Sequence, residues 1–166
     1  NSMHEASVPA PSRFKSKLRL LYRLHIEEPF LFRRSAEIFY RTFGGHILFQ
    51  TLNAAMDFDL FTKLDNKKHM TLEEISTALD TPSQACRIML LGLVASKILK
   101  KRGRYYKNTA VSKKLFSKNS PYNVAAYVKL QHRVMYPALS HFTESVRSGT
   151  NVGLGEFPGT EATIYE

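Results

Sequence analysis

Histidine and cysteine are the side chains here with the broadest chemistry, because both can bind metals, transfer protons or act as nucleophiles. The chain has six histidines and one cysteine, and none falls within a short metal-ligand spacing of another: His4, His25, His46, His69, Cys86, His132 and His141. Cys86 lies in an apolar run and is expected to be a small buried hydrophobe, while a Cys–His nucleophile pair stays open. We therefore predict no catalytic residue and no metal site.

Three glycines near the end of the chain have a spacing that resembles a nucleotide loop. Gly153, Gly155 and Gly159 form the pattern G-x-G-x-x-x-G, but no strand is predicted before it and no helix clearly follows. A phosphate-binding loop requires both neighbours. We interpret the segment as a flexible connector and predict no cofactor-binding residue.

Aromatic residues and methionine gather in one late segment of the chain. They are Tyr122, Tyr127, Met135, Tyr136 and Phe142. Core packing explains such a group, and so does a pocket wall for a flat, apolar ligand that Gln131, His132 and His141 would orient. Both interpretations stay open on the residues alone.

The basic side chains are unevenly distributed along the chain. The formal net charge is +10, and residues 81–143 contain twelve Lys and Arg but no Asp or Glu. Such a block attracts polyanions, which raises nucleic acid as a partner. A solvated basic face, or one that docks on an acidic protein, explains the same pattern.

Size and composition are those of a globular protein. The chain has 166 residues, of which 43% are hydrophobic and 23% charged, and this excludes a disordered or fibrous chain. No apolar stretch is long enough to span a membrane. A single cysteine fits a reducing compartment, so we expect a cytoplasmic protein.

The periodicity of apolar residues predicts helices over 13–25, 29–43 and 46–64, with Gly44 and Gly45 ending the second one. The second helix is too aromatic to remain uncovered in water. Residues 1–12 are expected to be a mobile tail whose first two residues are a cloning remnant.

The middle of the chain has clear helix-start signals. Thr71 and Glu74 form a capping box before a short helix that runs to Leu79. A second box at Thr81, with Pro82 at the first helical position, would open a helix to Ser96. Strands over 98–102 and 104–108 follow around Gly103, and Thr109 caps a helix to about residue 116. This order is typical of a winged helix-turn-helix.

The last third predicts a helix from residue 120 to about 147, which Pro137 should kink or split, and then an irregular glycine-rich stretch. The fold class is therefore mainly α: a winged helix-turn-helix core with a small β-hairpin, an N-terminal helical arm and C-terminal helices.

A DNA-binding winged helix would read bases with its second helix. Only Ser83, Gln84 and Arg87 could reach bases there. The rest of that helix is apolar and is expected to be buried on most sides. Because the nearby basic residues fall on the wing, the pattern favours phosphate contact over sequence reading.

Several motifs together resemble a known family. Residues 45–64 are similar to the alanine-rich helix and the Leu-Gly-(Leu/Val)-Phe-(Asp)-x-Leu turn of S-adenosylmethionine-dependent O-methyltransferases, with Asp57 in place of the usual glycine. Residues 71–79 resemble the family's T-x-x-E-L-A-x-x-L/T, and 85–100 its L-x-R-L-L-R-x-L helix. Residues 105–109 match Y-x-L/N-T, 140–149 resemble the closing (V/I)-R-(T/S)-G, and the chain from 159 onward resembles the start of the catalytic domain.

The resemblance, to enzymes of the plant caffeate and flavonoid and the bacterial polyketide-tailoring type, implies an N-terminal dimerisation domain that has lost DNA binding. It implies a helical dimerisation arm over 13–43, a winged-helix-like dimerisation core over 44–118, substrate-wall helices over 119–149, and a linker over 150–166 to an absent Rossmann-like catalytic domain. The chain would then form a homodimer in a parent enzyme that transfers methyl from S-adenosylmethionine to a phenolic or polyketide-like hydroxyl.

Residue roles follow from the same resemblance. The expected substrate-wall residues are Gln131, Met135, Tyr136 and Leu139. The expected dimer interface comprises Phe39, Tyr40, Phe43, Leu48 and Leu52. Because the catalytic domain is absent, we expect these 166 residues alone to bind no S-adenosylmethionine and to be inactive. The alternatives are a winged-helix transcription regulator that binds DNA and an adaptor that uses the fold for protein contacts.

Overall fold

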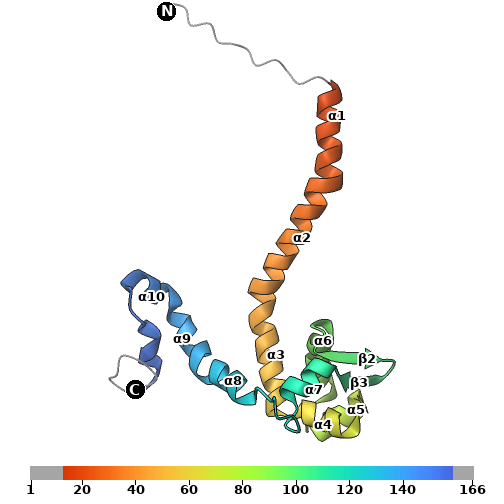
Figure 1. The fold of residues 1–166 in the computed structure, drawn as a ribbon, viewed down its shortest axis with the longest axis vertical. Coiled ribbons are helices and arrows are strands. Elements are labelled where there is room, and N and C mark those ends of the chain that lie inside the picture. The colour runs from red at the N-terminus through yellow and green to blue at the C-terminus, as the bar shows by residue number, and fades with distance from the viewer. Residues whose placement is uncertain (1–12, 159–166) are drawn as a thin grey trace, which may run out of the picture. The chain divides into compact units, whose positions relative to one another are not determined.

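A computed structural model describes residues 13–158, with side chains from Ser16 onward (Figure 1). The predicted tail over 1–12 and the predicted start of a catalytic domain at 159 lie outside the described residues. The chain divides into two compact units after His46. The first contains the arm, and the second contains the predicted winged helix and the C-terminal helices.

The arm consists of α1 (Arg13–Tyr22), a π-helical turn (Arg23–Glu27), α2 (Glu28–Phe39) and a second π-helical turn (Tyr40–Gly44). The two predicted helices are therefore joined by helical backbone. Pro29 explains the first π turn, because it lacks an N–H and its ring crowds the carbonyl four residues earlier. A wider turn relieves that crowding, and the Glu28 amide donates to the Arg23 carbonyl five residues back.

The prediction that Gly44 and Gly45 end a helix is wrong. Gly45 has φ −59° and ψ −47°, which are right-handed helical values, and α3 (Gly45–Asp57) begins at this residue. Glycine stops a helix where it takes a left-handed conformation. Elsewhere it only weakens the helix, by about 0.5–1 kcal/mol relative to alanine. No residue here imposes the left-handed turn.

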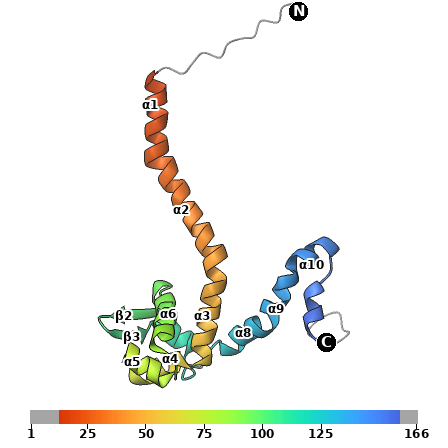
Figure 2. The ribbon, with the colours of Figure 1, turned by 180° about the vertical axis from the view of Figure 1, so that it is seen from behind.

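The winged helix is confirmed in its element order. It comprises α4 (Leu60–Lys67), β1 (Met70–Thr71), α5 (Leu72–Ala78), α6 (Ser83–Ala95), β2 (Leu99–Arg102), β3 (Tyr105–Asn108) and α7 (Ala110–Phe116). The strands form an antiparallel sheet in the order β1-β3-β2, and Figure 2 shows β2 and β3 from behind. Strand β1 was not predicted, because two residues are too few to show alternation.

Two of the three predicted helix starts are confirmed. The Thr71 amide donates to Glu74 Oε2 at 2.7 Å while the Glu74 amide donates to the Thr71 hydroxyl at 3.3 Å, so the capping box is complete. Thr109 caps α7 in the same way with Ser112. The box at Thr81 is wrong: Pro82 is the residue that precedes α6, with ψ 135°, and no side chain caps that end.

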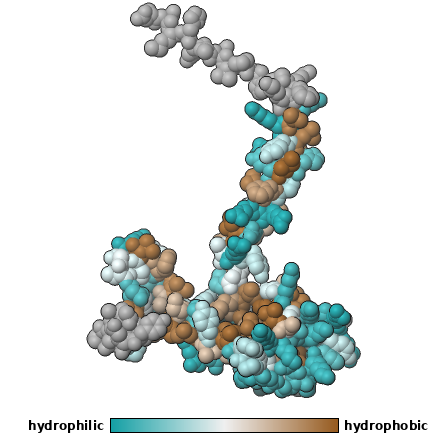
Figure 3. All heavy atoms as spheres, viewed as in Figure 1, coloured by the Kyte–Doolittle hydropathy of each residue, from teal (hydrophilic) through white to brown (hydrophobic). Residues whose placement is uncertain are grey.

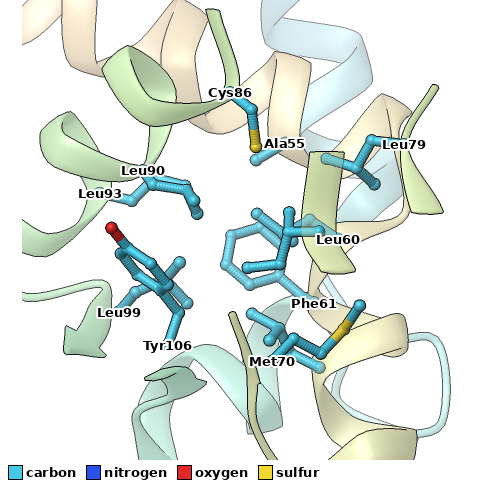
Figure 4. Close-up of a cluster of buried hydrophobic side chains, with 12 residues drawn as sticks. Ala55, Leu60, Phe61, Met70, Leu79, Cys86, Leu90, Leu93, Leu99 and Tyr106 are labelled. Carbon is cyan, nitrogen blue, oxygen red and sulfur yellow. The ribbon is translucent and has the colours of Figure 1, made fainter. Parts of the chain in front are cut away.

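The core of the second unit combines buried side chains from α4, β1, α5, α6, β2 and β3 (Figure 4), and Phe116 of α7 packs against it. Leu60, Phe61 and Leu64 bury one face of α4. Cys86, Leu90 and Leu93 bury one face of α6, and the buried state predicted for Cys86 is confirmed. Burial against apolar neighbours raises the pKa of its thiol. The expectation that α6 is buried on most sides is wrong, because Ile88 and Leu91 are 61% and 68% exposed.

The C-terminal helices follow the winged helix. They are α8 (Ala125–Leu130), a π turn (Gln131–Met135), α9 (Tyr136–Ala138), a 3₁₀ turn (Leu139–His141), α10 (Phe142–Ser148) and a 3₁₀ helix (Val152–Glu156). The first begins five residues later than predicted, where the Ala125 amide donates to Asn123 Oδ1 at 2.7 Å. Around Pro137 the regular α-helix is interrupted by a π turn and a 3₁₀ turn, while the backbone stays helical. Within residues 13–158 no helix has the length and hydrophobicity needed to cross a membrane.

A carboxylate on α4 ties the winged helix to the chain that follows α7. The Asp65 side chain is 8% exposed and pairs with Lys113 Nζ at 2.7 Å. It also accepts from the Ser117 hydroxyl at 3.0 Å and from Asn119 Nδ2 at 3.2 Å. The hydrogen bond from Lys113 is the main reason why the pKa of Asp65 lies below its ordinary value of 3.8.

Replacing Asp65 by Asn should lower the free energy of unfolding by about 1.5–3 kcal/mol, the usual contribution of hydrogen bonds to a charged group. Because folding lowers this pKa, the contribution is present above pH 3.8 and is lost as the pH falls through the folded pKa. Urea unfolding at several pH values should therefore show D65N and the unsubstituted chain converging in acid. The control is Glu73→Gln, an exposed carboxylate. A difference that persists unchanged in acid would contradict this account.

Candidate functional site

A pocket of about 690 Å³ lies in the second unit, among α9, α10 and the 3₁₀ helix that follows them. Its lining is predominantly apolar. The residues are Val134, Met135, Ala138, Leu139, Phe142, Ser145, Val146, Gly149, Thr150, Asn151, Gly153, Leu154 and Phe157. Volume and lining are those of a site for a small, largely apolar molecule.

One side of the pocket follows a helical stripe. Met135, Leu139, Phe142 and Val146 are spaced by four, three and four residues, which places them on one face. Pro137 lies inside this stripe and has no amide hydrogen to donate. The backbone therefore changes to a π turn before it and a 3₁₀ turn after it, and the stripe continues across the break.

The other side of the pocket is held by a reversal of the chain. Gly149 takes φ +69° and ends α10 with a left-handed cap, as glycine does at this position. The Val152 amide then donates to the Ser145 hydroxyl at 3.1 Å. Gly153 packs directly on α9: a Cβ added to it would lie 2.7 Å from the Ala138 carbonyl oxygen. Gly153 thus permits close packing between two backbones.

An ion pair also joins the two sides. His141 Nε2 lies 2.6 Å from Glu156 Oε1, and the His141 ring also lies near Glu144. An ionised carboxylate only accepts, so the imidazole N–H donates. The hydrogen bond to Glu156 is the main cause of the raised pKa of His141. Protonation of His141 therefore strengthens the contact between the 3₁₀ turn that contains His141 and the 3₁₀ helix that contains Glu156.

Two of the four predicted substrate-wall residues line the pocket, and two do not. Met135 and Leu139 line the pocket. Gln131 and Tyr136 do not, although both are half-buried. The Tyr136 ring stacks on Phe49, with 5.6 Å between ring centroids. Tyr136 directly follows Met135, and consecutive residues of a helix point about 100° apart, so the two side chains lie on different faces.

Sequence reasoning missed most of the lining. Phe142, one of the aromatic residues weighed above as a pocket wall, does line the pocket. Val146 was missed although it carried a usable signal, since it continues the helical spacing of Met135, Leu139 and Phe142. Leu154 and Phe157 carried none, because their segment contains glycines and has no periodicity. Their positions depend on the reversal at Gly149.

The predicted dimer residues fall in both units. On the arm, Phe39, Tyr40 and Phe43 are 64%, 54% and 60% exposed, and the rings of Phe39 and Phe43 stack at 4.7 Å. Figure 3 shows hydrophobic and hydrophilic residues mixed along the arm. In the second unit, Leu48 and Leu52 are half-buried, and Leu52 packs against the hydrophobic core.

The side chains that the structure describes include no cluster of three or more His, Cys, Asp or Glu with the proximity needed to hold a metal ion. The part of the second helix predicted to reach bases is exposed, at Ser83, Gln84 and Arg87.

The class of protein is a helical, winged-helix-like dimerisation domain. Residues 40–118 match the sequence profile of the O-methyltransferase dimerisation domain. The chain is 33% identical over 121 residues to an L-tyrosine C(3)-methyltransferase of Streptomyces lavendulae. It spans about a third of that relative, whereas the match covers 73% of this chain.

Solved structures show the same fold. The S-adenosylmethionine-dependent methyltransferase SibL, in its apo form, is 30% identical with a TM-score of 0.68, over 75% of this chain and 36% of that one. Human N-acetylserotonin methyltransferase, solved with S-adenosylmethionine, also gives 0.68 at 22% identity, over 76% and 39% of the two chains. These comparisons give no support to the DNA-binding alternative.

Replacing Gly153 by Ala should separate the reversal from α9, because the added methyl would clash with the Ala138 backbone. A clash of this kind costs about 1–3 kcal/mol. Amide hydrogen exchange over residues 152–156 should become faster. Gly155→Ala is the matched control, since a Cβ there meets nothing within 4 Å. Equal exchange in the two variants would show that the close contact does not hold the reversal.

Proposed function

We propose that this chain is the dimerisation and substrate-wall part of an S-adenosylmethionine-dependent methyltransferase. The parent enzyme would transfer methyl to a hydroxyl of a phenolic or polyketide-like small molecule, in the cytoplasm. The observation that carries the proposal is the dimerisation-domain match over 40–118, together with the apolar pocket lined by residues 134–157. S-adenosylmethionine would be bound by a catalytic domain of the parent protein.

The proposed substrate wall is centred on Met135 and Leu139, which are 40% and 53% exposed and line the pocket. A methionine and a leucine suit a flat ring, because both offer polarisable or apolar surface without a charge. Gln131 and Tyr136 stay proposed as contacts outside this lining. Ser145, Thr150 and Asn151 supply the polar groups that could orient a hydroxylated ligand.

Methylation of carbon is a second candidate, favoured by the relative that is named an L-tyrosine C(3)-methyltransferase. A deprotonated phenol shares its negative charge between the oxygen and the adjacent ring carbons, so either atom can attack a methyl donor. The choice would depend on which atom the catalytic domain presents to the donor. Both candidates require the same phenolic class of acceptor.

We propose a homodimer in which the arm is covered by the second copy. The described arm has no buried residue, yet it carries large apolar side chains along its whole length. An isolated helix with this exposure is unfavourable in water, and a two-fold interface would remove it. The aromatic groove formed by Phe32, Ala36, Phe39 and Tyr40 is a suitable contact on this helix.

Replacing Phe39 and Phe43 by Glu should give a monomer, because two charges would have to be buried in the apolar contact. Light scattering at several concentrations should show the mass of one chain for this variant and of two chains for the unsubstituted protein. Val111→Glu is the control, since Val111 is equally exposed, at 64%, but lies on α7. A dimer that survives the double substitution would refute the role of the arm.

The enzymatic proposal has a direct test. Calorimetry with S-adenosylmethionine should give no binding heat for these 166 residues, because residues 13–158 contain no strand followed by a glycine-rich turn and helix. The reading frame beyond Glu166 should encode a strand followed by G-x-G-x-G. The longer protein should then transfer labelled methyl to a phenolic acceptor. Micromolar binding of S-adenosylmethionine by the short chain would overturn this division of roles.

A further inference from the structure

A second hollow of about 400 Å³ lies on the winged helix, between the start of α5, the outer face of α6 and the wing. It is lined by Leu72, Glu73, Arg87, Ile88, Leu91, Val94, Lys101, Arg104 and Tyr106, and is called the α6 groove below. All of these residues belong to the second unit. The dimerisation and methyltransferase roles proposed above do not use this groove.

The wall of the α6 groove is apolar and uncovered. Ile88 and Leu91 stand three residues apart on one face of α6 and are 61% and 68% exposed. Tyr106 is only 5% exposed and lies at the base, where it also joins the core. Two aliphatic side chains exposed beside a buried aromatic ring form the kind of patch that marks a protein contact.

The rim of the α6 groove is mostly cationic. Lys101 Nζ lies 5.2 Å from the centroid of the Tyr106 ring, and the Arg104 guanidinium lies 5.4 Å from that of Tyr105. The first of these cation–π contacts holds Lys101 near the ring at the base of the groove. Among the ion pairs of the described side chains, none involves Arg87, Lys101 or Arg104. Glu73 contributes the one carboxylate in the lining.

We propose that the α6 groove docks an amphipathic helix of a partner protein that carries carboxylates beside aliphatic side chains. The aliphatic residues would cover Ile88 and Leu91, and the carboxylates would face the cations of the rim. Charge complementarity points to this partner, since residues 81–143 contain twelve cations and no carboxylate.

Two other occupants fit less well. Nucleic acid satisfies the cations through its phosphates, but a phosphate backbone offers no apolar group to cover Ile88 and Leu91. The arm of a second copy offers apolar side chains, but residues 1–43 carry eight basic and four acidic side chains, so they would repel the basic rim. An acidic amphipathic helix offers aliphatic side chains to the apolar wall and carboxylates to the cationic rim.

The test is fluorescence anisotropy on the full chain with three labelled probes. They are a helical peptide with leucines on one face and glutamates beside them, the same peptide with lysine for glutamate, and a short duplex DNA. We expect the glutamate peptide to bind at least about tenfold more tightly than the lysine peptide, a difference of about 1.4 kcal/mol. Comparable binding of the two peptides, or preference for DNA, would overturn the proposal.

Matched substitutions locate the binding surface. Leu91→Glu and Arg104→Glu should each weaken binding of the glutamate peptide by about tenfold or more, because the first puts a carboxylate on the apolar wall and the second reverses a rim charge. The controls are Val111→Glu on α7 and Lys129→Glu on α8, both exposed and outside the groove. Circular dichroism melting confirms that each variant folds. Equal loss in folded variants and controls would overturn the site.

Discussion

A nearly buried carboxylate, Asp65, anchors the start of the chain after α7 to α4. Asp65 takes hydrogen bonds or an ion pair from residues 113, 117 and 119, which come about fifty positions later in the sequence. Its side chain is nearly buried, so each of these donors replaces a water molecule that the carboxylate would otherwise need. The turn before α8 is thereby fixed against α4, and the pocket-forming helices start from a defined point. A neighbouring contact, from the Lys118 amide to the Thr62 hydroxyl at 3.0 Å, reinforces the same junction.

Local signals in the sequence predicted local structure well. The Thr71 and Thr109 caps depend on residues three apart, and the hairpin depends on a glycine with φ +56° at position 103. Predictions failed where the structure depends on contacts between residues far apart in the sequence, or where a local signal was not used by the fold. Gly44 and Gly45 have helical backbone because nothing requires a turn there, and β1 exists because β3 pairs with it. For the candidate site, the stripe through Met135 and Leu139 could be predicted. Leu154 and Phe157 could not, because only the packing of Gly153 on Ala138 brings them into the pocket.

Helix α6 has one buried face and one exposed face, and its composition does not distinguish them. Its sequence is apolar on nearly all sides, so the periodicity that normally separates buried from exposed residues is weak. The structure resolves the ambiguity: Cys86, Leu90 and Leu93 enter the core, and Ile88 and Leu91 remain outside. The excess positive charge, which first suggested nucleic acid, lies beside these exposed aliphatic residues. The positive charge alone therefore indicates only that the proposed partner is negatively charged. The exposed apolar surface beside it favours a protein over nucleic acid.

The π turns have a geometric consequence for any helix that packs along the arm. An α-helix advances about 100° per residue, so one additional residue in a turn rotates everything beyond it by about that angle. The apolar side chains of α1 and those of α2 are thus phased differently about the helix axis, with a further shift after the turn at Tyr40–Gly44. A partner with an uninterrupted heptad repeat would lose register at the first offset. The homodimer proposed above avoids this loss of register, because a second copy of this sequence has the same interruptions in the same places.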